Sequence, residues 1–361
     1  MAAGRSHSAV RMTITSQQRQ MIGTVRDLAQ AEFRNDALKY MDGTFPWDNM
    51  RKLAKLGVLG MAVPEEYGGM GLPVFDTALI LEEIAKVDYV TAMAVLGEAG
   101  VQTRVIATYA PEEIKQRILP KVCIAECILA ICMTEPHAGT DVANYKTSTV
   151  VKNDRVILNG TKTLISRAAE AGMFVVFTRI DGKPGREGIG CVLVEPGVKG
   201  FAVTGPYHTM GGENLHEVQF TDCELPLENL VIREDGFRKL LTAFNTQRCL
   251  NPSISLGLAE GAFDETVAYV RDRQDFLQRN VDPRHQRCGA ASWRLWLHRR
   301  VSRLTPLPRR ALRLARRRRL RNAARPDRAQ DRHRPRAWRR HPGPERRVRG
   351  DRRIVHVAGG S

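Results

Sequence analysis

The period of the hydrophobic pattern changes twice along the chain, and this order limits the fold more than any other feature. Between residues 15 and 127 apolar residues recur at three- and four-residue spacing, which is typical of amphipathic helices. Short β-branched runs, separated by Asn-Asp, Asn-Gly and Asp-Gly turns, follow in 128–235 and indicate strands. Helical spacing returns from residue 236. This order predicts an α+β protein in which a small antiparallel β domain follows an N-terminal helical domain.

The charge divides the chain at a similar place. Residues 281–361 hold 26 Arg, four Asp and one Glu but no Lys, a net charge of +21. The whole chain carries +17, so the first 280 residues carry −4. The basic segment keeps neither a helical nor a strand period, and it has too few clustered apolar residues to offset the entropy of ordering. We therefore expect a truncated C-terminal helical domain at 236–280 and a disordered Arg-rich tail at 281–361.

One segment carries the chemical signal. Cys132–Asp141 reads Cys-Met-Thr-Glu-Pro-His-Ala-Gly-Thr-Asp and follows a strand-like run. A loop at the end of a strand, with the Thr134 hydroxyl and free backbone N–H groups at Gly139 and Thr140, has donors for a flavin edge or for phosphate oxygens. Further motifs support this interpretation: they are Pro64–Leu72, Leu119–Lys121, Leu158–Ser166, Met210-Gly211, Glu224–Pro226 and Arg271–Phe276.

Together these motifs resemble those of the FAD-dependent acyl-CoA dehydrogenase family over about residues 15–276. The resemblance implies the fold of that family, with an N-terminal helical, a middle β and a C-terminal helical domain. It also implies α,β-dehydrogenation of an acyl-CoA thioester, with FAD as cofactor. The residues that it assigns to FAD are Cys132, Met133, Thr134, Gly139, Thr140, Leu164, Ile165, Ser166 and Arg273. The residues that it places beside the acyl-CoA are Thr140, Asn245 and Arg248.

The catalytic base is missing from both places where the family carries it. Most members take a Glu from the last third of the C-terminal domain, where this chain is Arg-rich. A smaller branch takes the Glu from the first C-terminal helix, just before an Arg, and here that position is Gln247. Glutamine is not a base. No catalytic residue is therefore identified from the sequence.

Two explanations remain open. Gln247 resembles the desulfinase branch of the family, which keeps the flavin but needs no such Glu; that branch has an Arg late in its N-terminal domain, and none lies between Asp88 and Glu98. Alternatively, a shift of reading frame between about residues 276 and 287 removed the true C-terminus together with the base. An Arg-rich sequence without Lys is typical of a GC-rich gene read out of frame, and this explanation is favoured.

The remaining expectations concern partners and location. The resemblance implies an electron-transferring flavoprotein or similar acceptor, and a homo-oligomer if the C-terminal domain were complete. A basic arm that binds nucleic acid is the rival interpretation of the tail, but natural arms usually mix Lys with Arg. The sequence contains no run of about eighteen apolar residues, so we expect no membrane span. No apolar segment follows the N-terminus, so we do not expect a secretory signal. The seven cysteines lack metal-ligand spacing, so no metal site is expected. Cysteines that are scattered in this way are typical of reduced thiols, so we expect a cytoplasmic location.

Overall fold

The computed structural model describes residues 14–272. Three predictions lie outside these residues: the disordered tail at 281–361, the last residues of the helical segment 236–280, and the role of Arg273. Within the described part, the order of elements is helical, then strand, then helical, as the hydrophobic periods predict.

Six α-helices form the first part of the chain. The first begins with a capping box in which the Thr15 hydroxyl accepts from the Gln18 N–H and the Gln18 side chain accepts from the Thr15 N–H, so Thr15 rather than the neighbouring serine caps it. The helices are α1 (Ser16–Leu28), α2 (Trp47–Lys55), α3 (Val74–Ala85), α4 (Tyr89–Ala99), α5 (Val101–Tyr109) and α6 (Glu112–Cys123). A π-helical turn follows α1 at η1 (Ala29–Phe33), and short 3-10 helices occur at η2 (Lys39–Asp42), η3 (Val58–Gly60) and η4 (Glu65–Tyr67).

The eight strands belong to one sheet. They are β1 (Ile128–Cys132), β2 (Ser148–Lys152), β3 (Arg155–Ser166), β4 (Ala171–Ile180), β5 (Ile189–Val194), β6 (Phe201–His208), β7 (Asn214–Pro226) and β8 (Leu230–Ile232). The order across the sheet is β6-β7-β3-β2-β4-β5-β8, and β1 also pairs with β4. The connections contain the 3-10 helices η5 (Val142–Asn144), η6 (Gly185–Gly188) and η7 (Leu227–Asn229).

The sheet is mixed, which corrects the prediction of an antiparallel β domain. Five strand pairs are antiparallel, but β1 and β2 both pair with β4 in parallel. The local turns identified in the sequence do make antiparallel neighbours, such as β2 and β3. The parallel pairs join strands that are distant in sequence, and a parallel pair needs a long connection that no local turn signal reveals.

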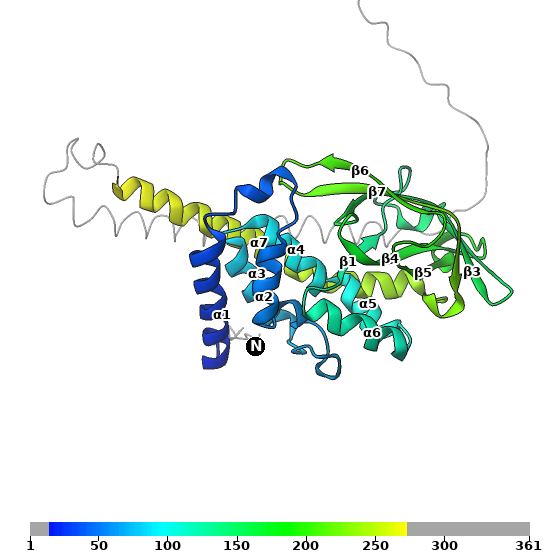
Figure 1. The fold of residues 1–361 in the computed structure, drawn as a ribbon, viewed down its shortest axis with the longest axis horizontal. Helices are drawn as coiled ribbons and strands as arrows, with labels where there is room; N and C mark the ends of the chain where they lie inside the picture. The colour runs from blue at the N-terminus through cyan, green and yellow to red at the C-terminus, as the bar shows by residue number, and fades with distance from the viewer. Residues whose placement is uncertain (1–13, 273–361) are drawn as a thin grey trace, which may run out of the picture. The chain divides into compact units, whose positions relative to one another are not determined.

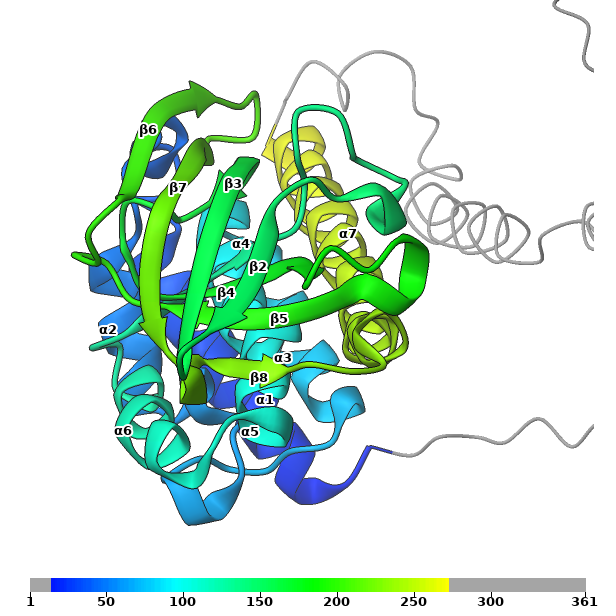
Figure 2. The same cartoon turned by 90° about the vertical axis from the view of Figure 1, so that its right-hand side faces the viewer.

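The last described element is α7 (Gly236–Asp272), a helix of 37 residues that contains Pro252. Figure 1 shows the strands grouped at one end with α5 and α6 beneath them, α1–α4 toward the other end, and α7 extending from the strands past α1–α4. In Figure 2 the strands lie toward the viewer and α1–α4 lie behind them. The chain turns between α4 and α5 at Gly100, where a Cβ would lie 3.0 Å from Gln247 Oε1 of α7.

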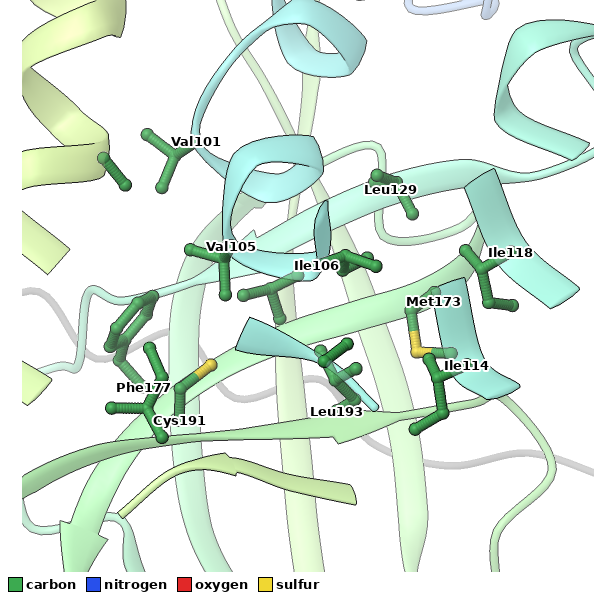
Figure 3. Packing of buried hydrophobic residues seen from close by; sticks show 14 of the residues in the cluster. Val101, Val105, Ile106, Ile114, Ile118, Leu129, Met173, Phe177, Cys191 and Leu193 are labelled. Atoms are coloured by element: carbon green, nitrogen blue, oxygen red, sulfur yellow. The ribbon is translucent and has the colours of Figure 1, made fainter. Parts of the chain in front are cut away.

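The largest buried cluster joins the helices to the sheet. Val105 and Ile106 of α5 and Ile114 and Ile118 of α6 pack on Leu193 and its neighbours on the sheet (Figure 3). Burying such side chains stabilises the fold by about 1.5–3 kcal/mol each. This cluster holds α5 and α6 against one face of the sheet.

Candidate functional site

A pocket of about 170 Å³ opens where the ends of β1 and β3 meet α4, α5 and α7. Five of the residues assigned to FAD from the sequence line it: Met133, Thr134, Leu164, Ile165 and Ser166. Gln247 of α7 lines it as well, at the position where one branch of the family carries its base. The pocket thus brings together segments that are more than eighty residues apart in the chain.

The first wall of the pocket is the end of β1. Side chains alternate between the two faces of a strand, and here Ile131 and Met133 line the pocket while Cys132 points into the core. Burial raises the pKa of the Cys132 thiol to about 12, so it stays protonated. The sequence-based assignment of Cys132 to the flavin edge is therefore not supported for its side chain, which lies on the opposite face from the pocket.

A buried ion pair holds the loop that follows β1. The Lys162 ammonium donates to Glu135 Oε1 at 2.8 Å and to the Met133 carbonyl at 3.0 Å, and neither side chain is exposed (0%). It also lies 3.7 Å from the centre of the Tyr145 ring. Burial lowers the pKa of Lys162 to about 8, and its charge is retained at neutral pH by Glu135.

Glu135 also accepts two backbone N–H groups, from Lys146 at 2.7 Å and from Thr147 at 3.1 Å. Burial raises the pKa of its carboxyl, but Lys162 and these donors together hold it below the usual value. The Thr134 carbonyl accepts from the Thr163 N–H at 2.8 Å, which ties the loop to β3 a second time. The loop is thus fixed from both of its ends.

The second wall is a distorted stretch of β3. The pairing of β3 with β7 shifts register between Lys162 and Ile165, and Leu164 adopts a left-handed φ of +56°. A left-handed conformation costs a non-glycine residue about 1–2 kcal/mol. The Leu164 side chain is nevertheless 52% exposed at the pocket mouth. A flat apolar ligand lying on Leu164 would cover its exposed side chain and offset the cost of its backbone conformation. This wall therefore fits a flavin ring.

A second buried ion pair lies beside the pocket. Arg167, which lines it, follows β3 with a φ of +60° and donates to the Ala94 carbonyl at 3.1 Å and to Glu98 at 3.3 Å. Its guanidinium lies over Gly97, where a Cβ would overlap with Nη1. Burial raises the pKa of Glu98 to about 7, although Arg167 and the Leu129 N–H oppose the shift.

The third wall is α7. Phe244 and Gln247 line the pocket, and Gln247 Oε1 is buried without a hydrogen-bond partner. Asn245 and Arg248, predicted to lie beside the acyl-CoA, are exposed and bonded to each other at 3.2 Å. Neither residue lines the pocket, so they could contact only a part of the acyl-CoA that extends outside the pocket.

Gly139 and Thr140 also lie away from the pocket, in the exposed part of the loop after β1. The free space around Gly139, where a Cβ would meet nothing within 4 Å, leaves the backbone open to a ligand. The predicted contact of Arg273 with FAD falls outside the described residues.

Four polar residues at the site were missed from the sequence: Glu98, Gln102, Arg167 and Glu213. Glu213, in the turn between β6 and β7, is the carboxylate among the described residues that line the pocket. A charged residue in a helical pattern, such as Glu98, is usually solvated, so its burial gives no sequence signal. Arg167 directly follows a recognised motif, and that position was the available clue.

Comparisons with known proteins agree with this geometry. The family models for the acyl-CoA dehydrogenase N-terminal, middle and C-terminal domains match residues 15–126, 130–223 and 234–301. An acyl-CoA dehydrogenase of Bacillus subtilis is 32% identical over 270 residues, which is 73% of this chain and 71% of that protein. The chain belongs to the acyl-CoA dehydrogenase family. It is therefore an oxidoreductase of the class that acts on CH–CH groups.

Two further relatives bear on the chemistry. A 3-sulfinopropanoyl-CoA desulfinase of Cupriavidus necator is 31% identical over 279 residues, 73% of this chain and 69% of that protein. A glutaryl-CoA dehydrogenase of Mycobacterium smegmatis, solved in complex with FADH2, superposes with a TM-score of 0.66 at 25% identity, covering 72% of this chain and 66% of that one. FAD is the cofactor of this acyl-CoA dehydrogenase family member.

The match to the family extends further toward the C-terminus than the change in composition at residue 281 indicates. The C-terminal domain model reaches residue 301, beyond the predicted boundary at 280 and into the Arg-rich segment. In residues 14–272, no helix is long and apolar enough to cross a membrane. The same residues contain no group of three or more His, Cys, Asp or Glu that could hold a metal ion.

Proposed function

We propose that this chain catalyses α,β-dehydrogenation of an acyl-CoA thioester, with the acyl group in the pocket between α4, α7 and the ends of β1 and β3. One observation carries the proposal: Thr134 and Leu164–Ser166, assigned to FAD by the family resemblance, line the same pocket as Gln247. The acyl group and the flavin edge must meet in one place, and this pocket joins residues assigned to FAD with the position at which one branch of the family carries its base.

The chain's own residues have distinct tasks in this proposal. Leu164 and Met133 offer apolar contact to the flavin ring, and Thr134 offers a hydroxyl to its edge. FAD, when bound, accepts the hydride that leaves the β carbon. The buried Lys162–Glu135 pair keeps the loop after β1 in position, since both groups are satisfied without a ligand. Phe244 of α7 closes the pocket from the other side and excludes water.

The α proton needs an acceptor within hydrogen-bond reach. Gln247 cannot take it. Glu213 lines the pocket and is the carboxylate that the described residues offer there. We therefore propose Glu213 as the acceptor in this chain, in place of the family's usual Glu. Exchange of the α proton of butyryl-CoA with D2O, followed by NMR, tests this: Glu213→Gln should abolish exchange, and exchange at the wild-type rate would refute the role.

A desulfinase is the second candidate, because Gln247 lines the pocket and a desulfinase is among the relatives. The two functions separate in one experiment on the full chain supplied with FAD under anaerobic conditions. Dehydrogenation bleaches the flavin absorbance when butyryl-CoA is added. Desulfination releases sulfite from 3-sulfinopropanoyl-CoA without net bleaching. Release of sulfite without bleaching by butyryl-CoA would overturn the first proposal, and absence of both would overturn each.

The remaining assignments are also proposals. The domains divide at 15–127, 128–235 and 236–280. An electron-transferring flavoprotein or a similar protein accepts the electrons, and the enzyme is a cytoplasmic homo-oligomer when its C-terminal domain is complete. We expect this chain to retain FAD weakly on purification. Size-exclusion chromatography with absorbance detection checks this expectation, and a yellow tetramer would contradict it.

The Arg-rich sequence that follows the family match, which ends at residue 301, is proposed to result from a shift of reading frame. Translating the gene in its other two frames checks this: no continuing helical domain there would exclude it. The alternative, a nucleic-acid-binding arm, predicts tight and salt-sensitive binding of nucleic acid in a filter assay, lost on truncation at residue 280.

A further inference from the structure

Four buried polar atoms at the pocket have no hydrogen-bond partner among the described residues. They are Glu98 Oε2, Gln102 Oε1, Arg167 Nε and Gln247 Oε1. Gln102, Arg167 and Gln247 line the pocket, and Glu98 is bonded to Arg167. Buried polar groups in folded proteins are nearly always paired, and each one left unpaired costs about 1–3 kcal/mol. Four at one place indicate that the partner comes from outside the chain.

The side-chain oxygens of the two glutamines that line the pocket lie near each other beside Gly100. Gln102 lies at the start of α5 and is 1% exposed, while Gln247 comes from α7. A Cβ placed at Gly100 would lie 3.0 Å from Gln247 Oε1 and 3.5 Å from Gln102 Oε1. Both oxygens therefore lie at the same turn between α4 and α5, where a Cβ on residue 100 would also meet the Leu96 carbonyl oxygen at 2.7 Å, so Gly100 allows this close approach.

Arg167 and Glu98 set the charge of this end of the pocket. Arg167 is 7% exposed and Glu98 is fully buried, and their ion pair balances their charges. An anionic group that approached Arg167 would also meet the Glu98 carboxylate. An ammonium would meet the guanidinium. The unpartnered atoms comprise three acceptors and one donor, so a neutral group that both donates and accepts satisfies them best.

We propose that the acyl group taken by this pocket carries a neutral hydrogen-bonding substituent, a hydroxyl in its simplest form, which donates its proton to the amide oxygen of Gln102 or Gln247 and accepts from Arg167 Nε. The proposal rests on the proposed function in placing the acyl group in this pocket. It goes beyond that function by naming the substrate class. An unsubstituted acyl chain would leave the amide oxygens unpaired, and a dicarboxylic acyl chain would bring a second negative charge to Glu98.

Three thioesters with the same two-methylene spacer test the proposal. Butyryl-CoA ends in a methyl group, 3-hydroxypropanoyl-CoA in a hydroxyl and succinyl-CoA in a carboxylate. Calorimetric titration of the full chain with saturating FAD gives the Kd of each without relying on turnover. We expect the hydroxyl compound to bind about tenfold more tightly than butyryl-CoA, the effect of one to two hydrogen bonds. Succinyl-CoA should bind more weakly than the hydroxyl compound.

Variants locate the effect. Gln102→Met keeps the length of the side chain and removes its amide, so the preference for the hydroxyl compound should fall to less than threefold. Gln247→Met changes a residue on a different helix and should also lower the preference. It therefore replaces Gln102→Met as the test if that variant folds poorly. Gln116→Met is the matched control, because Gln116 is exposed on α6 and bonded to Glu112, away from the pocket. The preference should be unchanged in the control.

The outcomes separate the two proposals. If no CoA thioester binds, the proposed function fails. If butyryl-CoA binds as tightly as the hydroxyl compound, the function stands and the substrate class is wrong, with ordered water satisfying the polar atoms. Tightest binding of succinyl-CoA would also overturn the substrate class, because the Arg167 charge would then be available to an anion. A preference that survives both glutamine variants would refute the assigned contacts.

Discussion

Lys162 Nζ lies 2.8 Å from Glu135 Oε1, and both side chains are fully buried beneath the loop that follows β1. Lys162→Met removes the cation and leaves the Glu135 carboxylate buried without its charge partner. Loss of one partner of a buried pair costs about 3–5 kcal/mol. We expect the free energy of unfolding to fall by that amount, measured by urea denaturation.

Arg117→Met is the control for this prediction. Arg117 and Glu195 form a salt bridge of the same length, 2.8 Å, but both side chains are partly exposed. Such pairs contribute about 0–1 kcal/mol. If Lys162→Met and Arg117→Met cost the same, the pair does not anchor the loop.

A methyl group at position 97 should displace Arg167. Gly97 lies in α4, where alanine is normally favoured by about 1 kcal/mol. Its Cβ would instead overlap with the Arg167 guanidinium. We expect Gly97→Ala to destabilise the protein by about 2 kcal/mol, as overpacking of a core does, and to weaken binding of CoA thioesters. Thermal unfolding and calorimetry measure the two effects.

Gly23→Ala is the matched helical control. A Cβ at Gly23 in α1 would meet nothing within 4 Å. The substitution should therefore raise the melting temperature slightly, by the ordinary preference of a helix for alanine. A Gly97→Ala variant that is also stabilised would show that Arg167 does not need the space above α4.

Glu98 should make stability depend on pH. Burial raises its pKa from 4.5 to about 7, so the folded state binds this proton more tightly than the unfolded state does. The resulting stability is complete below pH 4.5 and is lost as the pH rises through 7, in total about 3 kcal/mol. The free energy of unfolding of the wild type minus that of Glu98→Gln should therefore decrease between pH 5 and pH 8. A difference that stays constant would contradict the raised pKa.

Leu164 should matter for the cofactor but not for the fold. Its side chain is exposed at the pocket mouth, so Leu164→Ser should leave the melting temperature nearly unchanged. Covering the exposed half of this leucine with a ligand contributes about 0.8–1.5 kcal/mol, so the Kd for FAD should rise about four- to tenfold in a fluorescence titration. Leu227→Ser, on an exposed turn outside the pocket, is the control and should leave the Kd unchanged.

Several features of the fold could be predicted because they are local. The period of the apolar residues predicts a helical part, a strand part and a second helical part, and the structure confirms this order. The parallel pairing of β1 with β4 could not be predicted, because it joins segments about forty residues apart. Its strands carry only the apolar pattern that any buried strand has.

The candidate site divides in the same way. Thr134 and Leu164 belong to motifs and could be named before the structure was known. Glu98 and Gln102 could not, because nothing in a helical pattern distinguishes a polar residue that faces a pocket from one that faces water. The face of the strand that the Cys132 side chain takes could not be predicted, because the motif gives only its position along the strand.

The parallel pairing of β1 with β4 has a consequence for biosynthesis. Contacts between segments distant in sequence form late, since the intervening chain must close first. The helices α1–α6 leave the ribosome before any of the strands, and β1 then has no partner until residues 171–176 have emerged. Translation must therefore pass Val176 before β1, the strand that leads into the loop after Cys132, is paired with β4, and by then a little under half of the segment 128–235 has been made.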